Sequence, residues 1–150
     1  MLTADGPQVI EFNCRFGDPE TQVVLPMLDA DLADLMLACV DGSLSAEMVK
    51  QHPGACATVV MASPGYPASY PKGLAISGTA EANAAGGIVF HAGTQRNDEG
   101  QLVTSGGRVL AVSARGDDLV SAVDNAYAAL ENISFDGAHF RKDIGRKDAG

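Results

Sequence analysis

The stretch "VIEFNCRFGDPETQ", residues 9–22, changes its pattern halfway along its length. Residues 9–16 alternate between two kinds of side chain, and this alternation predicts a β-strand because successive side chains of a strand point to opposite faces. One face is polar, and the other is expected to pack in a core. The polar face consists of Glu11, Asn13 and Arg15, and the apolar face of Phe12, Cys14 and Phe16.

The polar face of the predicted strand combines a carboxylate, an amide oxygen and a guanidinium. Glu11 and Asn13 are expected to lie about 7 Å apart, at a rise of roughly 3.3 Å per residue. Oxygen ligands of this kind suit hard cations such as Mg²⁺, and Arg15 offers a planar pair of donors for a carboxylate or a phosphate. The same alternation also fits a solvated face on an edge strand, so the pattern alone leaves both interpretations open.

Two helices are predicted after this strand. Asp18 suits the N-cap of the first helix and Pro19 its first position, while Pro26 is expected to limit it to a turn or two. The second helix is predicted over residues 31–40, with Gly42 closing it. Its apolar residues fall at helical spacing: Leu32, Leu35, Met36 and Cys39.

The rest of the sequence predicts short strands followed by one long helix. The turn at 96–100 indicates a hairpin between two of the strands. The helix is predicted over 117–133, with Asp117 or Asp118 as its cap. The predicted strands are 57–63, 74–79, 87–94, 101–107 and 108–114, and the apolar stripe of the helix is Leu119, Val123, Ala126, Tyr127 and Leu130.

The predicted fold class is therefore α+β, with the chain divided in two. Residues 43–54 are polar and irregular, and a domain boundary is placed there. Residues 52–145 are expected to form a small, mostly antiparallel sheet domain with one long helix. One strand and two helices do not bury a core alone, so residues 1–46 are predicted to be the end of a larger domain. Residues 146–150 are expected to be a charged tail.

Composition restricts the possible partners. The net charge of −9 and the absence of Trp argue against a nucleic-acid partner, because such proteins rely on cations and stacking aromatics. No run of about 18 apolar residues indicates a membrane span, and no signal peptide is recognised. An odd number of cysteines without a C-x-x-C motif indicates buried thiols in a reducing cytoplasm. They are Cys14, Cys39 and Cys56.

Five segments together resemble the phosphoribosylamine–glycine ligases, also called glycinamide ribonucleotide synthetases, of the ATP-grasp superfamily. They occur in the order of that family and cover most of the chain. The run from Arg15 to Thr21 favours this family over a related biotin-dependent carboxylase subunit. The segments are "EFNCRFGDPETQ" (11–22), "VVMASPGYP" (59–67), "FHAGT" (90–94), "VTSGGRVLAV" (103–112) and "RKDIG" (141–145).

The resemblance implies an enzyme that joins glycine to 5-phosphoribosylamine in purine synthesis. ATP activates glycine as an acyl phosphate, which the sugar amine then attacks. By the same resemblance, Glu11 and Asn13 hold Mg²⁺ or Mn²⁺ against the ATP phosphates. Arg15 is assigned a catalytic role and binding to a substrate carboxylate or the acyl phosphate. The resemblance also implies that residues 1–46 end an ATP-grasp domain.

Three further residues are candidates for substrate binding. Gly17 and Asp18 are expected beside the substrates at a helix amino terminus, although Asp18 also fits a plain helix cap. Arg108 follows two glycines and is expected to reach a phosphate, and a hairpin turn with a surface arginine fits equally well. No role is assigned to His91 or Lys72.

Two functional hypotheses follow. In the first, the chain is part of the ligase and is inactive alone, because the amino-terminal lobes of the same enzyme are expected to precede Met1. In the second, it is a non-catalytic interaction or assembly module, with an exposed strand edge that favours a homodimer.

Overall fold

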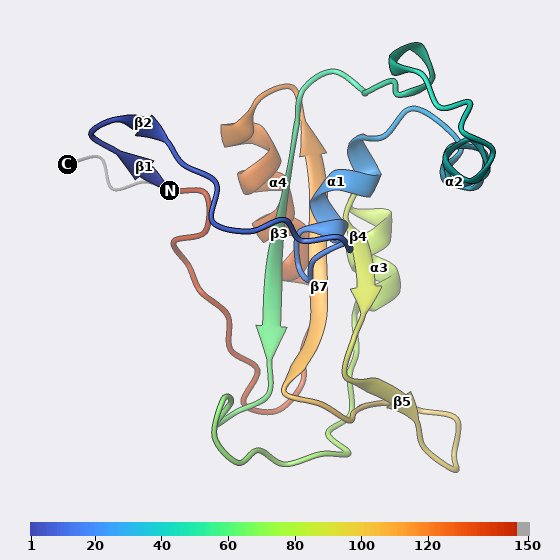
Figure 1. Cartoon of the computed structure of the whole chain (residues 1–150). Coiled ribbons are helices and arrows are strands. Elements are labelled where there is room, and N and C mark those ends of the chain that lie inside the picture. The colour runs from blue at the N-terminus through green and yellow to red at the C-terminus, as the bar shows by residue number, and fades with distance from the viewer. Residues whose placement is uncertain (147–150) are drawn as a thin grey trace.

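A three-stranded antiparallel sheet forms the centre of the molecule, in the computed structural model that describes residues 1–146 (Figure 1). Its strands are β3 (Ala55–Ala62), β4 (Ile88–His91) and β7 (Arg108–Gly116), and β7 lies between the other two. The apolar runs in the sequence predict β3 and β7 within a few residues. The α+β fold class is confirmed.

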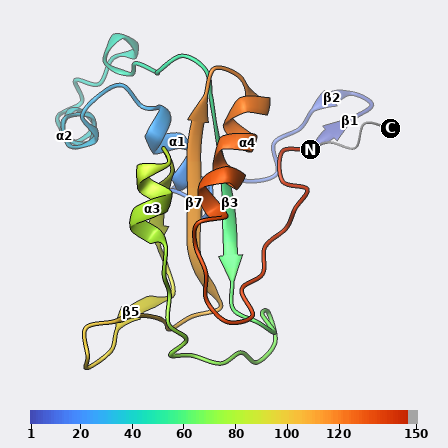
Figure 2. The same ribbon diagram turned by 180° about the vertical axis from the view of Figure 1, so that it is seen from behind.

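Helices cover both faces of this sheet. The long helix α4 (Leu119–Leu130) packs on β7 and β3, and the short α3 (Thr79–Ala84) lies beside it against β4 (Figure 2). The helix α1 (Thr21–Met27) lies on the opposite face, in front of β7 in Figure 1. Because β7 is covered from both sides, residues 109–114 are all buried, whatever face they point to.

The main core lies between the sheet and α4. Val59 pairs with Val112, and Met61 pairs with Leu110. These apolar pairs pack against the small residues of α4, which let the helix approach the sheet closely. The helix residues in this core are Ala122, Val123, Ala126, Ala129 and Leu130.

The long helix α4 begins as the sequence predicts, with one exception. Asp118 caps it and accepts a hydrogen bond from the backbone N–H of Ser121, whose side chain bonds back to Asp118. The expected place of Leu119 in the apolar stripe is wrong, because its side chain is 55% exposed. Side chains in the first turn lean towards the amino terminus of a helix, so this leucine extends beyond the sheet.

Smaller elements flank this core. The predicted hairpin is confirmed as β5 (Thr94–Arg96) paired with β6 (Leu102–Thr104). The strand expected over 74–79 is present only as isolated bridges at Ala75 and Ser77, after which the unpredicted α3 begins. A second small hairpin joins β1 (Leu2–Thr3) to β2 (Gly6–Pro7), and a single 3₁₀ turn spans Ala46–Met48. None of the helices in residues 1–146 combines the length and hydrophobicity that crossing a membrane requires.

The predicted strand over residues 9–16 is wrong. A strand exists only where a neighbour accepts and donates its backbone hydrogen bonds, and no described segment pairs with residues 9–16. The expected burial of its apolar face is also wrong, since Phe12 is 83% exposed and Phe16 is 52% exposed.

The two predicted helices near the amino terminus are present. The helix α1 ends one residue after Pro26, as the sequence predicts, but its N-cap is Glu20 and not Asp18. The helix α2 (Leu32–Asp41) is capped by Asp31 and closed by Gly42 in the left-handed conformation. Of the residues of α2, only Ala38 is buried.

The burial expected for the cysteines is wrong for two of the three. Cys14 and Cys39 are exposed, whereas Cys56 is buried in β3. The exposed pair lies on residues 9–16 and on α2, which have little else of the described chain packed on them. Burial raises the pKa of the Cys56 thiol, which keeps it in its neutral form.

Candidate functional site

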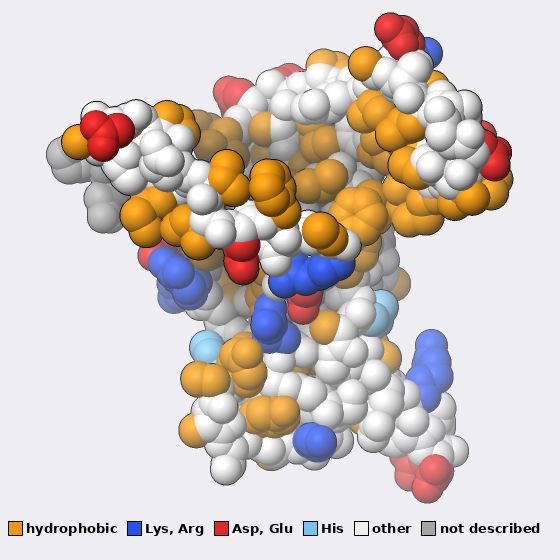
Figure 3. Space-filling model, viewed as in Figure 1, with side chains coloured by type: hydrophobic (Ala, Val, Ile, Leu, Met, Phe, Trp, Pro, Cys, Tyr) orange, Lys and Arg blue, Asp and Glu red, His pale blue; other side chains and the backbone are white. Residues whose placement is uncertain are grey.

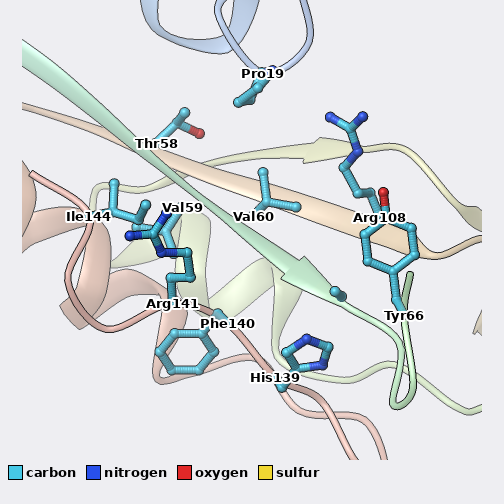
Figure 4. A pocket seen from close by; sticks show the side chains of 11 residues that line it. Pro19, Thr58, Val59, Val60, Tyr66, Arg108, His139, Phe140, Arg141 and Ile144 are labelled. Carbon is cyan, nitrogen blue, oxygen red and sulfur yellow. The ribbon is translucent and has the colours of Figure 1, made fainter. Parts of the chain in front are cut away.

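A groove of about 400 Å³ runs along β3, between residues 139–144 and the turn before α1 (Figure 4). Its apolar floor includes Val60 and Ala62 of β3 and Phe140 of the carboxy-terminal segment. Figure 3 shows Lys and Arg side chains gathered across the middle of the face that carries this groove. The site therefore combines an apolar floor with cationic walls.

The cationic side chains stand at separate places along the groove. Arg108, at the start of β7, lies beside Tyr66 at one end, and Arg141 lies towards the other end, near Phe140 (Figure 4). His139 also lines the groove. A guanidinium beside an aromatic ring and an apolar floor suits a small ligand with an anionic group and a less polar body.

Packing against Tyr66 explains why the residue directly before Arg108 is glycine. A side chain added at Gly107 would overlap the ring of Tyr66, whose Cδ2 lies 2.1 Å from the position of the added atom. Glycine thus lets the tyrosine ring lie directly against the backbone next to Arg108. The two glycines before Arg108 join β6 to β7, but the two strands lie in different sheets and do not pair, so the hairpin-turn interpretation is wrong.

The structure brings Asp18 to Arg108, although 90 positions separate them in the sequence. The Nη1 group of Arg108 donates a hydrogen bond to the Asp18 carbonyl at 3.0 Å and lies 3.4 Å from its carboxylate oxygen Oδ2. Both side chains are about half exposed, so solvent screens the pair and its contribution to stability is small. Its consequence is to fix where the guanidinium points.

Gly17 lies directly before this contact. Its carbonyl accepts hydrogen bonds from the backbone N–H and the hydroxyl of Thr21, the first residue of α1. These bonds close the turn that carries Asp18 and Pro19 to the edge of the groove. Gly17 therefore shapes the site through its backbone.

Residues 139–144 form one wall of the groove and are fastened to α4. The hydroxyl of Tyr127 donates to the carbonyl of Arg141 at 2.7 Å and accepts from the N–H of Ile144 at 3.1 Å. Arg141 itself forms a two-point ion pair with Asp143, which keeps the pKa of that carboxyl below its usual value. The guanidinium of Arg141 is therefore already paired with a carboxylate of the same segment.

Sequence reasoning did not select Tyr66, His139 or Arg141 as site residues. A single tyrosine in a Pro-rich loop and a single histidine carry no periodic signal. Only their position along β3, set by the bridge between Ala62 and His139, brings them to the groove. The segments "VVMASPGYP" and "RKDIG" contain or border them, but the segments did not indicate that the two regions meet.

Glu11, Asn13 and Arg15 lie outside this groove. All three are exposed on residues 9–16, and none makes a side-chain hydrogen bond or ion pair within residues 1–146. Asn13 and Arg15 line a separate shallow hollow of about 370 Å³ together with Cys14 and Phe16. The structure therefore assembles Asp18 with Arg108 and leaves the other three candidates on a separate stretch of chain.

The donor set at residues 11 and 13 is chemically suited to a hard cation, although it is small. Within residues 1–146, no group of three or more His, Cys, Asp or Glu side chains is placed to hold a metal ion. Mg²⁺ commonly binds one or two protein oxygens and completes its shell with waters and substrate phosphates. A carboxylate and an amide oxygen, both exposed and not engaged by described neighbours, fit that mode of binding.

Comparisons with known proteins cover almost the whole chain. It is 53% identical over 146 residues to the trifunctional purine biosynthetic protein adenosine-3 of Gallus gallus, covering 97% of this chain and 14% of that protein. It is 50% identical over 147 residues to a phosphoribosylamine–glycine ligase of Nostoc sp., covering 97% of this chain and 35% of the relative. The chain thus spans only a minor part of the length of these relatives.

A solved structure agrees with the fold described above. The crystal structure of phosphoribosylamine–glycine ligase from Thermotoga maritima superposes on the chain with a TM-score of 0.82 and 35% sequence identity. The match covers 96% of this chain and 35% of that one. Residues 56–147 match the family model described as "Phosphoribosylglycinamide synthetase, C domain". The chain therefore belongs to the phosphoribosylglycinamide synthetase family and contains its C domain.

Proposed function

We propose that the chain forms part of an ATP-dependent ligase that joins glycine to 5-phosphoribosylamine, with ADP and phosphate as further products. The observation that carries the proposal is the 50% identity over 147 residues with a protein named as that ligase. The match covers 97% of the chain and leaves out only a few residues, so it includes residues 11–18 and Arg108, which are all the candidate site residues. We further propose that residues 1–46 end an ATP-grasp domain, that a boundary separates them from residues 52–145, and that the enzyme acts in the cytoplasm.

The candidate residues lie in two places, and we assign a different role to each. Glu11 and Asn13 would hold Mg²⁺ or Mn²⁺, which neutralises charge on the ATP phosphates when it is bound. Arg15, two residues further on, would bind the carboxylate of glycine or the acyl phosphate made from it. Arg108 would bind the phosphate of the sugar amine at the groove, close to Gly17 and Asp18.

The groove residues support this assignment through the groups they leave available. Asp18 engages Nη1 of Arg108, and Nη2 and Nε make no hydrogen bond within residues 1–146. Two adjacent N–H donors of one guanidinium match two oxygens of a phosphate. The apolar floor excludes water from one side of the bound sugar, which strengthens the charged contact.

A second candidate function is a non-catalytic interaction or assembly module. It is favoured by the apolar side chains that the amino-terminal part of the chain leaves uncovered, such as Phe12, Leu37 and Val40. Exposed apolar surface of this kind is typical of a face that binds another protein surface, including a second copy.

A chimera distinguishes the two functions. The chain would replace the matching third of the Nostoc ligase, and ADP release would be measured with ATP, glycine and 5-phosphoribosylamine. We expect activity that depends on both substrates. Glu11→Gln is expected to lower turnover about 100-fold, the order found when one group that stabilises transition-state charge is removed.

Glu99→Gln is the matched control, because Glu99 is exposed on the hairpin turn between β5 and β6. It is expected to leave turnover unchanged. A folded chimera without ATP-dependent turnover would favour the assembly module. Full turnover in the Glu11→Gln chimera would disprove the metal assignment alone.

A further inference from the structure

A series of hydrogen bonds connects the buried centre of the sheet to the first turn of α1. Ser113, in the central strand β7, is fully buried. Its hydroxyl donates to the carbonyl of Gln22 at 2.7 Å and shares a second hydrogen bond with the Thr58 hydroxyl at 2.8 Å. Because β7 is held on both sides by other strands, this contact fixes Gln22 relative to the sheet.

The side chain of Gln22 continues the series towards the groove. Its amide Nε2 donates to Oδ1 of Asp18 at 2.9 Å. The other carboxylate oxygen, Oδ2, lies 3.4 Å from Nη1 of Arg108, which also donates to the Asp18 carbonyl at 3.0 Å. The two oxygens of one carboxylate thus face two different partners, and the plane of the carboxylate is set between them.

The buried amide oxygen of Gln22 indicates that glutamine is not the most stabilising side chain for the fold at this position. Oε1 is buried and receives no hydrogen bond from residues 1–146. Turning the amide over would place this oxygen against the Asp18 carboxylate and lose the one side-chain hydrogen bond that Gln22 makes within the described residues. A buried acceptor without a donor lowers stability, so an apolar side chain of similar size would serve packing better. What the amide adds is its bond to Asp18.

We propose that Gln22 is a positioning residue for Arg108. Through Asp18 it holds the guanidinium at the end of the groove, with Nε and Nη2 directed away from the ion pair. Pro19 and Arg108 both line the groove (Figure 4), and the turn that follows Gly17 carries Pro19 and contacts Arg108 through Asp18, so it shapes this part of the wall. Only the identity of the bound anion, a sugar phosphate, rests on the proposed function.

The test compares Gln22→Leu with the unsubstituted 150-residue chain. Three measurements are made: urea unfolding, NMR relaxation of the Arg108 side-chain Nε–Hε group, and the Kd of ribose 5-phosphate as the probe. We expect unchanged or increased stability, a loss of order at Arg108, and binding weakened about threefold to tenfold. Gln95→Leu is the matched control, because Gln95 is exposed on β5, does not line the groove and makes no side-chain hydrogen bond within residues 1–146.

A double-mutant cycle separates positioning from packing. In the Asp18→Ala background, Gln22→Leu is expected to change neither the order of Arg108 nor the Kd of ribose 5-phosphate. Removing the Asp18 carboxylate has already broken the link between Gln22 and Arg108. Gln22→Met serves in place of the leucine variant if that variant does not fold.

Two outcomes would overturn the proposal. One is an Arg108 side chain as ordered in the Gln22 variant as in the unsubstituted chain. The other is an effect of equal size in the Asp18→Ala background. Absence of ribose 5-phosphate binding to the unsubstituted chain would instead refute the sugar-phosphate assignment, and the relaxation measurement would still decide the role of Gln22.

Discussion

The carboxylate of Asp118 closes the amino-terminal end of α4. It accepts a hydrogen bond from the Ser121 backbone N–H at 2.8 Å, and the Asp118 backbone N–H donates to the Ser121 hydroxyl oxygen at 3.1 Å. The bonds from Ser121 lower the pKa of the Asp118 carboxyl below its usual value. A carboxyl whose pKa is lower in the folded state stabilises the fold when it is ionised, so this residue links stability to pH.

Asp118→Ala is expected to destabilise the chain at pH 7 and to do so less at acid pH. The stabilisation is fully present above the unfolded carboxyl pKa, near 3.8, and is lost as the pH falls through the lower folded pKa. Urea unfolding at pH 7, 4 and 2.5 measures the difference between the two proteins. Asp117→Ala is the control, because Asp117 makes no capping bond among the described residues. A difference that stays constant across this range would contradict the linkage.

At the level of single residues, the sequence identifies Gly17, Asp18 and Arg108 as candidates but does not predict that Asp18 contacts Arg108. The sequence predicts Asp18 either beside the substrates or as a helix cap; it does not cap α1, and its carboxylate contacts Gln22 and Arg108. That contact depends on α1 lying on the face of β7, which no local pattern encodes. The residues that complete the groove were not selected, because isolated tyrosine, histidine and arginine side chains have no spacing to recognise.

At the level of elements, local pattern predicts those strands and helices that are long or capped. The helix α4 has both a cap and a stripe, and α2 has Asp31 and Gly42 at its ends. In the strand β7, residues 109–114 are buried and all but Ser113 are apolar, because helices cover both faces of the strand. The six-residue α3 is too short to show a period, and residues 9–16 alternate like a strand but have no partner in the described chain.

The burial of β7 makes a prediction at this scale. Leu110 is fully buried between the sheet and α4, so Leu110→Ala removes apolar contacts and leaves a cavity. We expect it to lower the free energy of unfolding by about 2–5 kcal/mol. Leu119→Ala makes the same chemical change at a residue that is 55% exposed, and its effect should stay within about 0.5 kcal/mol.

Equilibrium urea denaturation of the two leucine variants provides the measurement. Similar losses of stability would mean that α4 does not cover β7 as described. A large loss of stability in Leu119→Ala alone would mean that a different face of α4 packs against the core.

At the level of the whole molecule, apolar burial is divided very unevenly along the chain. Twelve of the fifteen large hydrophobic side chains that are exposed in residues 1–146 belong to residues 1–49. Apart from Met27 and Ala38, every buried hydrophobic residue of the described chain lies in the range 56–135. The amino-terminal part thus has almost no core of its own, as the sequence predicts for a segment that completes a larger domain. This imbalance also supports the domain boundary, which stays a prediction.

Limited digestion with trypsin tests this uneven stability directly. Local opening is easiest where few apolar contacts and backbone hydrogen bonds hold the chain. Arg15 and Lys50 are exposed and lie in segments without regular secondary structure. We expect the first cuts after these two residues, before any cut after Arg115 in the central strand β7.

Mass spectrometry of the early fragments identifies the order of cleavage. Arg115 is a suitable internal reference because its side chain is exposed while its backbone is paired with Cys56 of β3. Protection there depends on the sheet and not on access to the side chain. Cleavage after Arg115 as early as after Arg15 would show that residues 55–133 lack independent stability. The amino-terminal part would then be needed to hold the sheet together, and the division of the chain near residue 50 would be wrong.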